Sequence, residues 1–134
     1  MPDTFIYSEE CVVRSIEKGQ LRDLLIVNLD CNNLSMNLDM ISSINTLNVN
    51  EKVNVIFSAS KPEFGVDDFC AHGYVVTEKR KKIENEENFV TIISFFGPLL
   101  RISSKTSFLE RYKLNIMDHI YFCIKKQSVV VLSK

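Results

Sequence analysis

The sequence predicts an all-β fold, a small closed or nearly closed antiparallel barrel of eight strands with one or two short helical turns. Apolar and polar residues alternate with period two along much of the chain, turn signals separate these stretches at short intervals, and helical patterns are few. Connections this short favour antiparallel hairpins over strand-helix-strand crossovers. A β-sandwich is the competing architecture, and a chain of 134 residues is expected to form a single domain over residues 1–134.

Alternation is clearest in residues 34–40, Leu-Ser-Met-Asn-Leu-Asp-Met, which predicts a strand with one buried and one wet face. Residues 53–57 and 120–124 repeat this pattern. The remaining segments are predicted to be strands by their β-branched and aromatic content. In chain order, the predicted strands span residues 11–16, 24–30, 34–40, 53–57, 73–77, 89–96, 99–103 and 120–124.

Two places in the chain carry a helical signal. Ser107 and Glu110 have the Ser-x-x-Glu spacing of a capping box, but only a turn or two of helix fits before Asn115. Residues 41–49 leave room for another turn. Residues 127–134 form either a last strand through residues 129–132 or a tail that becomes ordered only against a partner.

Composition limits the classes of function. The chain carries 16 basic and 17 acidic residues, a formal charge of −1, so no global field attracts nucleic acid or an anionic membrane. Only four glycines occur, and they form neither a phosphate-binding loop nor a dinucleotide-binding fingerprint. Nucleotide binding by those routes is therefore excluded, and we expect no small-molecule substrate.

The four cysteines, Cys11, Cys31, Cys70 and Cys123, include no Cys-x-x-Cys pair, and no apolar segment approaches the length of a signal or membrane helix. This pattern predicts a reduced, cytoplasmic protein without membrane contact. Cys70 and His72 are two possible metal ligands close together, but a zinc site usually needs four. Ordinary packing at the start of a strand is the favoured interpretation, so we expect no metal, no cofactor and no catalytic residue.

A basic run, Lys79, Arg80, Lys81 and Lys82, is followed by acidic residues between two predicted strands. A solvated hairpin loop whose two halves offset each other is the favoured interpretation, and a local contact with nucleic acid is the alternative. Small barrels that bind oligonucleotides stack bases on exposed aromatic side chains in a basic groove. A free-standing single-strand-binding protein is therefore a second hypothesis, although the chain has no tryptophan and no excess positive charge.

The most distinctive stretch is Ser-Phe-Phe-Gly-Pro-Leu-Leu-Arg-Ile, residues 94–102. Gly97 and Pro98 are expected to form the corner between two strands, because proline cannot donate to a strand ladder and glycine permits the bend. Residues 70–76, Cys-Ala-His-Gly-Tyr-Val-Val, precede it, and residues 121–124, Tyr-Phe-Cys-Ile, follow. In this order and spacing, the chain resembles the eighth subunit of the nuclear RNA polymerases and its archaeal relatives.

That family has a Tyr-Gly strand, a variable linker, a Ser-Phe-Gly-Gly-Leu-Leu-Met-Arg-Leu strand, a short helical turn and a final Tyr-Leu-Leu-Ile strand. The N-terminal half is less sharply similar, at residues 16–19 and 38–40. Pro98 departs from the family pattern, which usually has Leu or Gly there. The segment between residues 58 and 70 is much shorter than the acidic insertion of the eukaryotic members, so the chain looks like a crenarchaeal version.

The resemblance implies a barrel of the oligonucleotide/oligosaccharide-binding (OB) type. It also implies a non-catalytic subunit of DNA-directed RNA polymerase, present with the polymerase at the nucleoid, that contacts DNA or RNA only indirectly. Such subunits dock on the outside of the largest subunit near its pore. The active-site carboxylates would then belong to another chain.

An obligate interface is expected to combine apolar residues with a few polar anchors, among which arginine is enriched. We therefore expect Arg101 to be the polar anchor of a contact with the largest subunit. The alternative places Phe96, Leu100 and Ile102 in the core and leaves Arg101 facing water. The candidate interface residues are Phe95, Phe96, Gly97, Leu99, Leu100 and Arg101.

Overall fold

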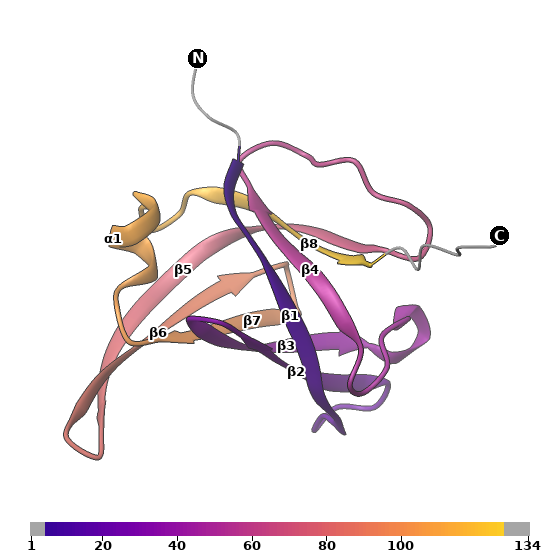
Figure 1. Cartoon of the computed structure of the whole chain (residues 1–134), viewed down its shortest axis with the longest axis horizontal. Helices are drawn as coiled ribbons and strands as arrows, with labels where there is room; N and C mark the ends of the chain where they lie inside the picture. Colours follow the sequence, from indigo (N-terminus) through magenta and orange to yellow (C-terminus); the bar gives the residue numbers. More distant parts are fainter. Residues whose placement is uncertain (1–4, 128–134) are drawn as a thin grey trace, which may run out of the picture.

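The computed structural model describes residues 5–127, and its eight antiparallel strands form one sheet that closes on itself into a ring (Figure 1). The order around the ring is β1-β2-β3-β7-β6-β5-β8-β4, and pairing of β4 with β1 closes it. The strands are β1 (Phe5–Lys18), β2 (Leu24–Cys31), β3 (Leu34–Ile41), β4 (Lys52–Ser58), β5 (Phe69–Ile83), β6 (Glu86–Ser94), β7 (Leu99–Ser104) and β8 (His119–Lys126).

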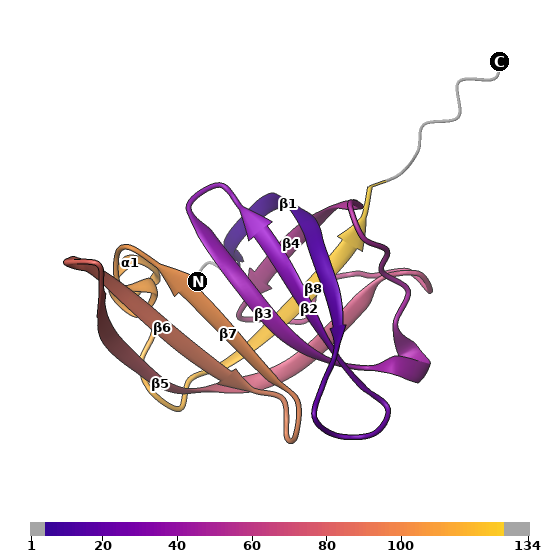
Figure 2. The same ribbon diagram turned by 90° about the horizontal axis from the view of Figure 1, so that it is seen from below.

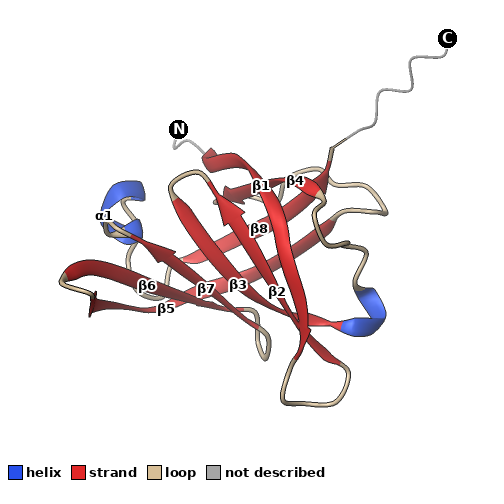
Figure 3. Cartoon of the chain, turned by 60° about the horizontal axis from the view of Figure 1, so that its bottom comes forward, coloured by secondary structure: helices blue, strands red, loops and turns tan. Residues whose placement is uncertain are grey.

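Every predicted strand overlaps one of these eight, and a single closed sheet excludes the competing sandwich. The helical elements are a 3-10 turn, η1 (Ser42–Ile44), and one short helix, α1 (Phe108–Tyr112). Both fall where the sequence left room for them, and Figure 3 shows them in blue on opposite sides of the ring. The alternative last strand at residues 129–132 lies outside the described residues.

The core fills the inside of the ring with the alternate residues of each strand. In β3, Leu34, Met36, Leu38 and Met40 are buried, as the period-two pattern predicts. Helix α1 adds Phe108, whose ring lies 5.2 Å from that of Phe57. The short helix thereby contributes directly to the hydrophobic core.

Helix α1 begins where the capping signal predicted. The Ser107 hydroxyl oxygen accepts a hydrogen bond from the Glu110 backbone N–H at 3.1 Å. Lys113, in the left-handed conformation, ends the helix after little more than one turn.

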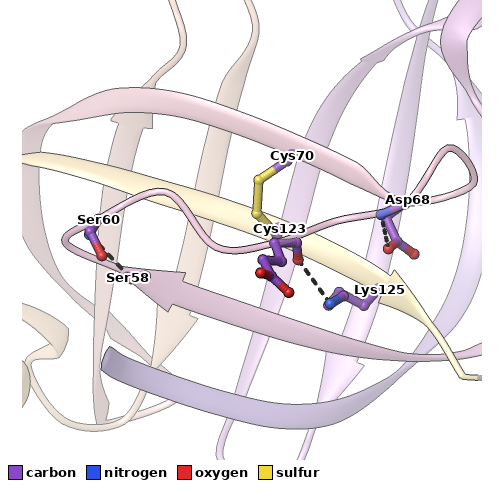
Figure 4. The surroundings of a disulfide bond; sticks show 8 residues. Ser58, Ser60, Asp68, Cys70, Cys123 and Lys125 are labelled. Atoms are coloured by element: carbon purple, nitrogen blue, oxygen red, sulfur yellow. Dashed lines mark hydrogen bonds between the residues drawn. A yellow bond between two sulfur atoms is a disulfide. The ribbon is translucent and has the colours of Figure 1, made fainter. Parts of the chain in front are cut away.

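The cysteines correct the prediction of a reduced protein, because the structure contains two disulfides, Cys11–Cys31 and Cys70–Cys123. Each joins residues that lie directly opposite each other on neighbouring strands, with Cα atoms 4.3 and 4.0 Å apart. Figure 4 shows the second pair beside the loop that connects β4 to β5. Sequence spacing did not reveal these pairs, since strand register brings the cysteines together.

Candidate partner interface

The turn between β6 and β7 presents one large aromatic side chain to solvent. Strand β6 ends at Ser94, β7 begins at Leu99, and the Phe95 N–H donates to the Pro98 carbonyl oxygen at 2.9 Å. The corner predicted at Gly97 and Pro98 is therefore confirmed. Phe96 has a φ of 64° and Gly97 a φ of 129°, and the Phe96 side chain is 74% exposed. A bulky residue rarely adopts positive φ, so this backbone holds an exposed aromatic ring at a conformational cost.

Two other members of the predicted interface point into the ring. Phe95 is partly buried and stacks on Phe122, with ring centroids 6.1 Å apart. Leu100 is fully buried in the core. These two residues can support the turn from within, whereas Phe96, Gly97, Leu99 and Arg101 retain exposed surface.

Arg101 lies on the outer face of β7 and is fixed by the neighbouring strand β3. Its Nη1 donates to Asn37 Oδ1 at 2.7 Å and to Asp39 Oδ1 at 3.2 Å. The second oxygen of Asp39 accepts the Leu99 N–H at 3.0 Å. Within residues 5–127 both guanidinium contacts use Nη1, so Nε and Nη2 remain available to a partner.

A row of polar side chains continues from Arg101 across the outer face of β3, β2 and β1. Asn37 donates to Asn28 at 2.8 Å, and Asn28 donates to Ser15 at 2.9 Å. An open groove of about 440 Å³ lies along part of this row. This half of the outer face is polar and internally hydrogen-bonded.

The opposite half, on β5 and β8, carries an aromatic surface that we define as His72, Tyr74, Phe96, His119 and Tyr121. His72 lies 4.4 Å from the Tyr121 ring, and the Tyr74 and Phe96 rings are 5.6 Å apart in edge-to-face geometry. His72 Nε2 and His119 Nδ1 are 3.1 Å apart, within hydrogen-bond distance. The sequence analysis missed this surface, although the His-x-Tyr spacing on both strands places all four side chains on one face.

The basic run lies in a hairpin that extends beyond the ring. Arg80 pairs with Glu87 at 3.6 Å and lies over the Phe89 ring, with 5.6 Å between the guanidinium carbon and the ring centroid. Lys79, Lys81 and Lys82 are exposed, like Arg80. The hairpin form of this segment is confirmed, and its contact with nucleic acid stays a prediction.

Among residues 5–127, no three or more His, Cys, Asp or Glu side chains are grouped so that they could hold a metal ion. None of the helices described in the structure is long and apolar enough to cross a membrane. The outer face thus offers contact surfaces: an aromatic one, a polar one and a projecting hairpin.

Comparison with known proteins decides the family. The model of the RpbG family, a subunit of DNA-directed RNA polymerase, matches residues 6–127. The chain belongs to this family. It is 48% identical to DNA-directed RNA polymerase subunit Rpo8 of Saccharolobus solfataricus over 120 residues, which cover 88% of this chain and 91% of the relative.

The same subunit of Saccharolobus shibatae is 46% identical over 88% of this chain and 92% of its own length. The subunit of Sulfolobus acidocaldarius is 36% identical over 88% of this chain and 96% of its own length. The chain is therefore the Rpo8 subunit of a DNA-directed RNA polymerase, and these relatives are crenarchaeal. The resemblance seen in the sequence is confirmed, and the hypothesis of a free-standing single-strand-binding protein is not supported.

Proposed function

We propose that this Rpo8 subunit is a non-catalytic chain that docks on the largest polymerase subunit through a surface formed by Tyr74, Phe96, Gly97, Leu99 and Arg101. We call these residues the docking surface. The observation that carries the proposal is the exposed Phe96 ring, held at positive φ beside Tyr74. Protein interfaces are enriched in Tyr, Phe and Arg, and central anchors of this kind supply most of the binding energy.

Arg101 is suited to act as the polar anchor of this surface. Its pairing with Asp39 fixes the side chain before a partner arrives, so less conformational entropy is lost on binding. The guanidinium retains two donor groups that match a carboxylate or a backbone carbonyl. Phe95 and Leu100 then act indirectly, by fixing the turn and the strand from the inside.

We also propose that residues 1–134 are one domain and that the ring is a barrel of the OB type. One hydrophobic core is shared by all eight strands, and antiparallel pairing of β1 with β4 closes the sheet. On this proposal the subunit is located with the polymerase at the nucleoid in the cytoplasm. Contact with DNA or RNA occurs only indirectly, through other subunits.

Site-specific photo-crosslinking tests the docking surface. We expect Phe96→p-benzoylphenylalanine, incorporated into the native polymerase, to crosslink to the largest subunit. Val66→p-benzoylphenylalanine is the matched control, because Val66 is 97% exposed in the loop before β5, away from the docking surface. Crosslinking from Phe96 to a different subunit, or to none, would overturn the proposal.

Charge reversal gives a second test, by competition for incorporation into polymerase. Arg101→Glu should lower recovery of the subunit in purified polymerase at least about tenfold, because it removes the polar anchor and repels a carboxylate on the partner. Arg22→Glu, an exposed residue in the β1–β2 turn, should be recovered like the wild type. A melting temperature measured for each free variant separates lost docking from lost folding.

A further inference from the structure

The hairpin of β5 and β6 extends past the strands that flank it in the ring. Strand β8 pairs with β5 only from Phe69 to Tyr74, and β7 pairs with β6 only from Phe89 to Ser94. Residues 79–88, which we call the arm, therefore form a two-stranded ribbon, and Figures 1 and 2 show it projecting from the ring. One edge of β5 is left without a neighbouring strand along the arm.

The direction of each backbone group along β5 follows from the pairing. Val75 directs its N–H and carbonyl away from β6, because they bond Asp118 and Met117 at 2.9 and 2.7 Å. At the other end, Ile83 and Glu86 flank the two-residue turn and form its closing hydrogen-bonded pair. Alternation between these ends, allowing for the bulge between Val75 and Thr77, directs the backbone groups of Arg80 and Lys82 toward the open edge.

Charge is distributed unevenly across the arm. All four basic residues, Lys79, Arg80, Lys81 and Lys82, lie on β5 at the open edge, whereas Glu86 and Glu87 lie on β6. An added strand would lie about 4.8 Å from β5 and about twice that distance from the glutamates of β6. It would therefore meet mainly positive charge.

We propose that the open edge of the arm binds an extended acidic segment of another polymerase subunit by β-strand addition. The backbone groups of Arg80 and Lys82 supply the hydrogen bonds, and the four basic side chains select for carboxylates. A lysine-rich edge also resists pairing with apolar or basic strands, so the same residues that protect the free arm define its partner.

The distribution of charge disfavours two other occupants. A second copy of this chain would bring a second basic edge against the first, and like charges on directly opposed residues are destabilising. Nucleic acid would meet a nearly balanced arm, since Glu84, Glu86 and Glu87 oppose the four basic residues and Arg80 already pairs with Glu87. A polypeptide strand with acidic side chains uses both the backbone groups and the charge.

Hydrogen exchange at single-residue resolution tests the proposal, with the free chain compared to the native polymerase. In the free chain, the amides of Arg80 and Lys82 should exchange rapidly, while those of Lys79 and Lys81, bonded within the hairpin, are protected. In the polymerase, exchange at Arg80 and Lys82 should slow at least about 100-fold. Unchanged exchange at these two amides would overturn the proposal, as would their protection by added single-stranded RNA instead of by assembly.

A pair of variants isolates one backbone donor. Lys82→Pro removes an N–H that points to the open edge and leaves the ladder between β5 and β6 intact, whereas Lys82→Ala removes the same charge and keeps the N–H. Lys82→Pro should compete for incorporation about tenfold less well than Lys82→Ala, with similar melting temperatures for the two free chains. Equal incorporation would contradict strand addition.

This inference assumes assembly into polymerase, but it does not depend on Arg101 or on which subunit supplies the strand. Failure of the crosslink from Phe96 to the largest subunit, with protection at Arg80 and Lys82 still present, would overturn the docking proposal alone. The reverse pattern would overturn strand addition alone.

Discussion

At Gly73 the backbone of β5 approaches the end of β6 so closely that no side chain fits. A Cβ atom there would lie 2.1 Å from the Ser94 carbonyl oxygen and 2.6 Å from the Phe95 ring. Because Ser94 is fixed by its pairing in the sheet, the strand cannot move away freely. We expect Gly73→Ala to lower the free energy of unfolding by about 2–3 kcal/mol, measured by denaturant titration.

Gly65 provides the matched control for this substitution. The nearest atom to a Cβ at Gly65 is the Asp68 carboxylate at 3.6 Å, an ordinary contact in an exposed loop. Gly65→Ala should change the free energy of unfolding by less than about 0.5 kcal/mol. If Gly73→Ala proved equally mild, the close approach of β5 to Ser94 would be wrong.

Individual residues of the candidate site were only partly predictable. The period of β7 assigns Leu100 and Ile102 to one face and Leu99 and Arg101 to the other, and the structure agrees. The partner of Arg101 was beyond reach, because Asp39 is 62 residues away and meets it only through the pairing of β3 with β7. Phe96 was assigned to a strand, and only the backbone of the turn shows that its ring faces solvent.

At the scale of elements, Glu78 ties helix α1 to β5. Its carboxylate accepts hydrogen bonds from the hydroxyls of Ser107 and Thr91 at 2.5 and 2.7 Å, and from the backbone of the helix. Burial raises the pKa of Glu78, but these hydrogen bonds together lower it further, and the net pKa lies below the ordinary value of 4.5.

This lowered pKa predicts how stability depends on pH. The folded state binds protons at Glu78 less readily than the unfolded state, so its contribution is fully present above about pH 4.5 and is lost as pH falls through the folded pKa. Glu78→Gln should be less stable than the wild type at pH 7 and should lose less stability between pH 5 and pH 3. Denaturant titrations across this range measure both effects.

Two variants sharpen the test of Glu78. Glu17→Gln, an exposed carboxylate at the end of β1, should retain the wild-type slope of stability with pH. Ser107→Ala, which removes both the helix cap and a hydrogen bond to Glu78, should lower the free energy of unfolding by about 1–2 kcal/mol. A slope for Glu78→Gln identical to that of the wild type would contradict this account.

The position of each element was predictable wherever one face is buried, because burial imposes period two. The ends were not: β5 was expected over residues 73–77 but spans Phe69–Ile83. Both faces of the arm are exposed, so its sequence carries no alternation of apolar and polar residues. Charged strands outside the core resemble loops in the sequence.

At the scale of the whole molecule, closure of the ring depends on contacts between distant segments. Strand β1 pairs with β4, β3 pairs with β7, and β8 inserts between β4 and β5. Local turn signals specify the hairpins but none of these pairings, which is why the sequence predicted eight strands without their order. The disulfides were missed for the same reason: Cys70 meets Cys123 only because β5 lies beside β8.

The two disulfides therefore reinforce the sheet at pairings that local sequence does not specify. They span sequence separations of 20 and 53 residues, which correspond to about 3 and 4 kcal/mol of stabilisation through the unfolded chain. The purified chain, unfolded without reductant, should resist alkylation at all four cysteines, and reduction should lower its melting temperature. The Cys70→Ala/Cys123→Ala variant should lose more stability than Cys11→Ala/Cys31→Ala, since it opens the longer loop. Four alkylated thiols in the unreduced chain would show that the paired cysteines stay reduced, and that strand pairing and the core alone hold the ring closed.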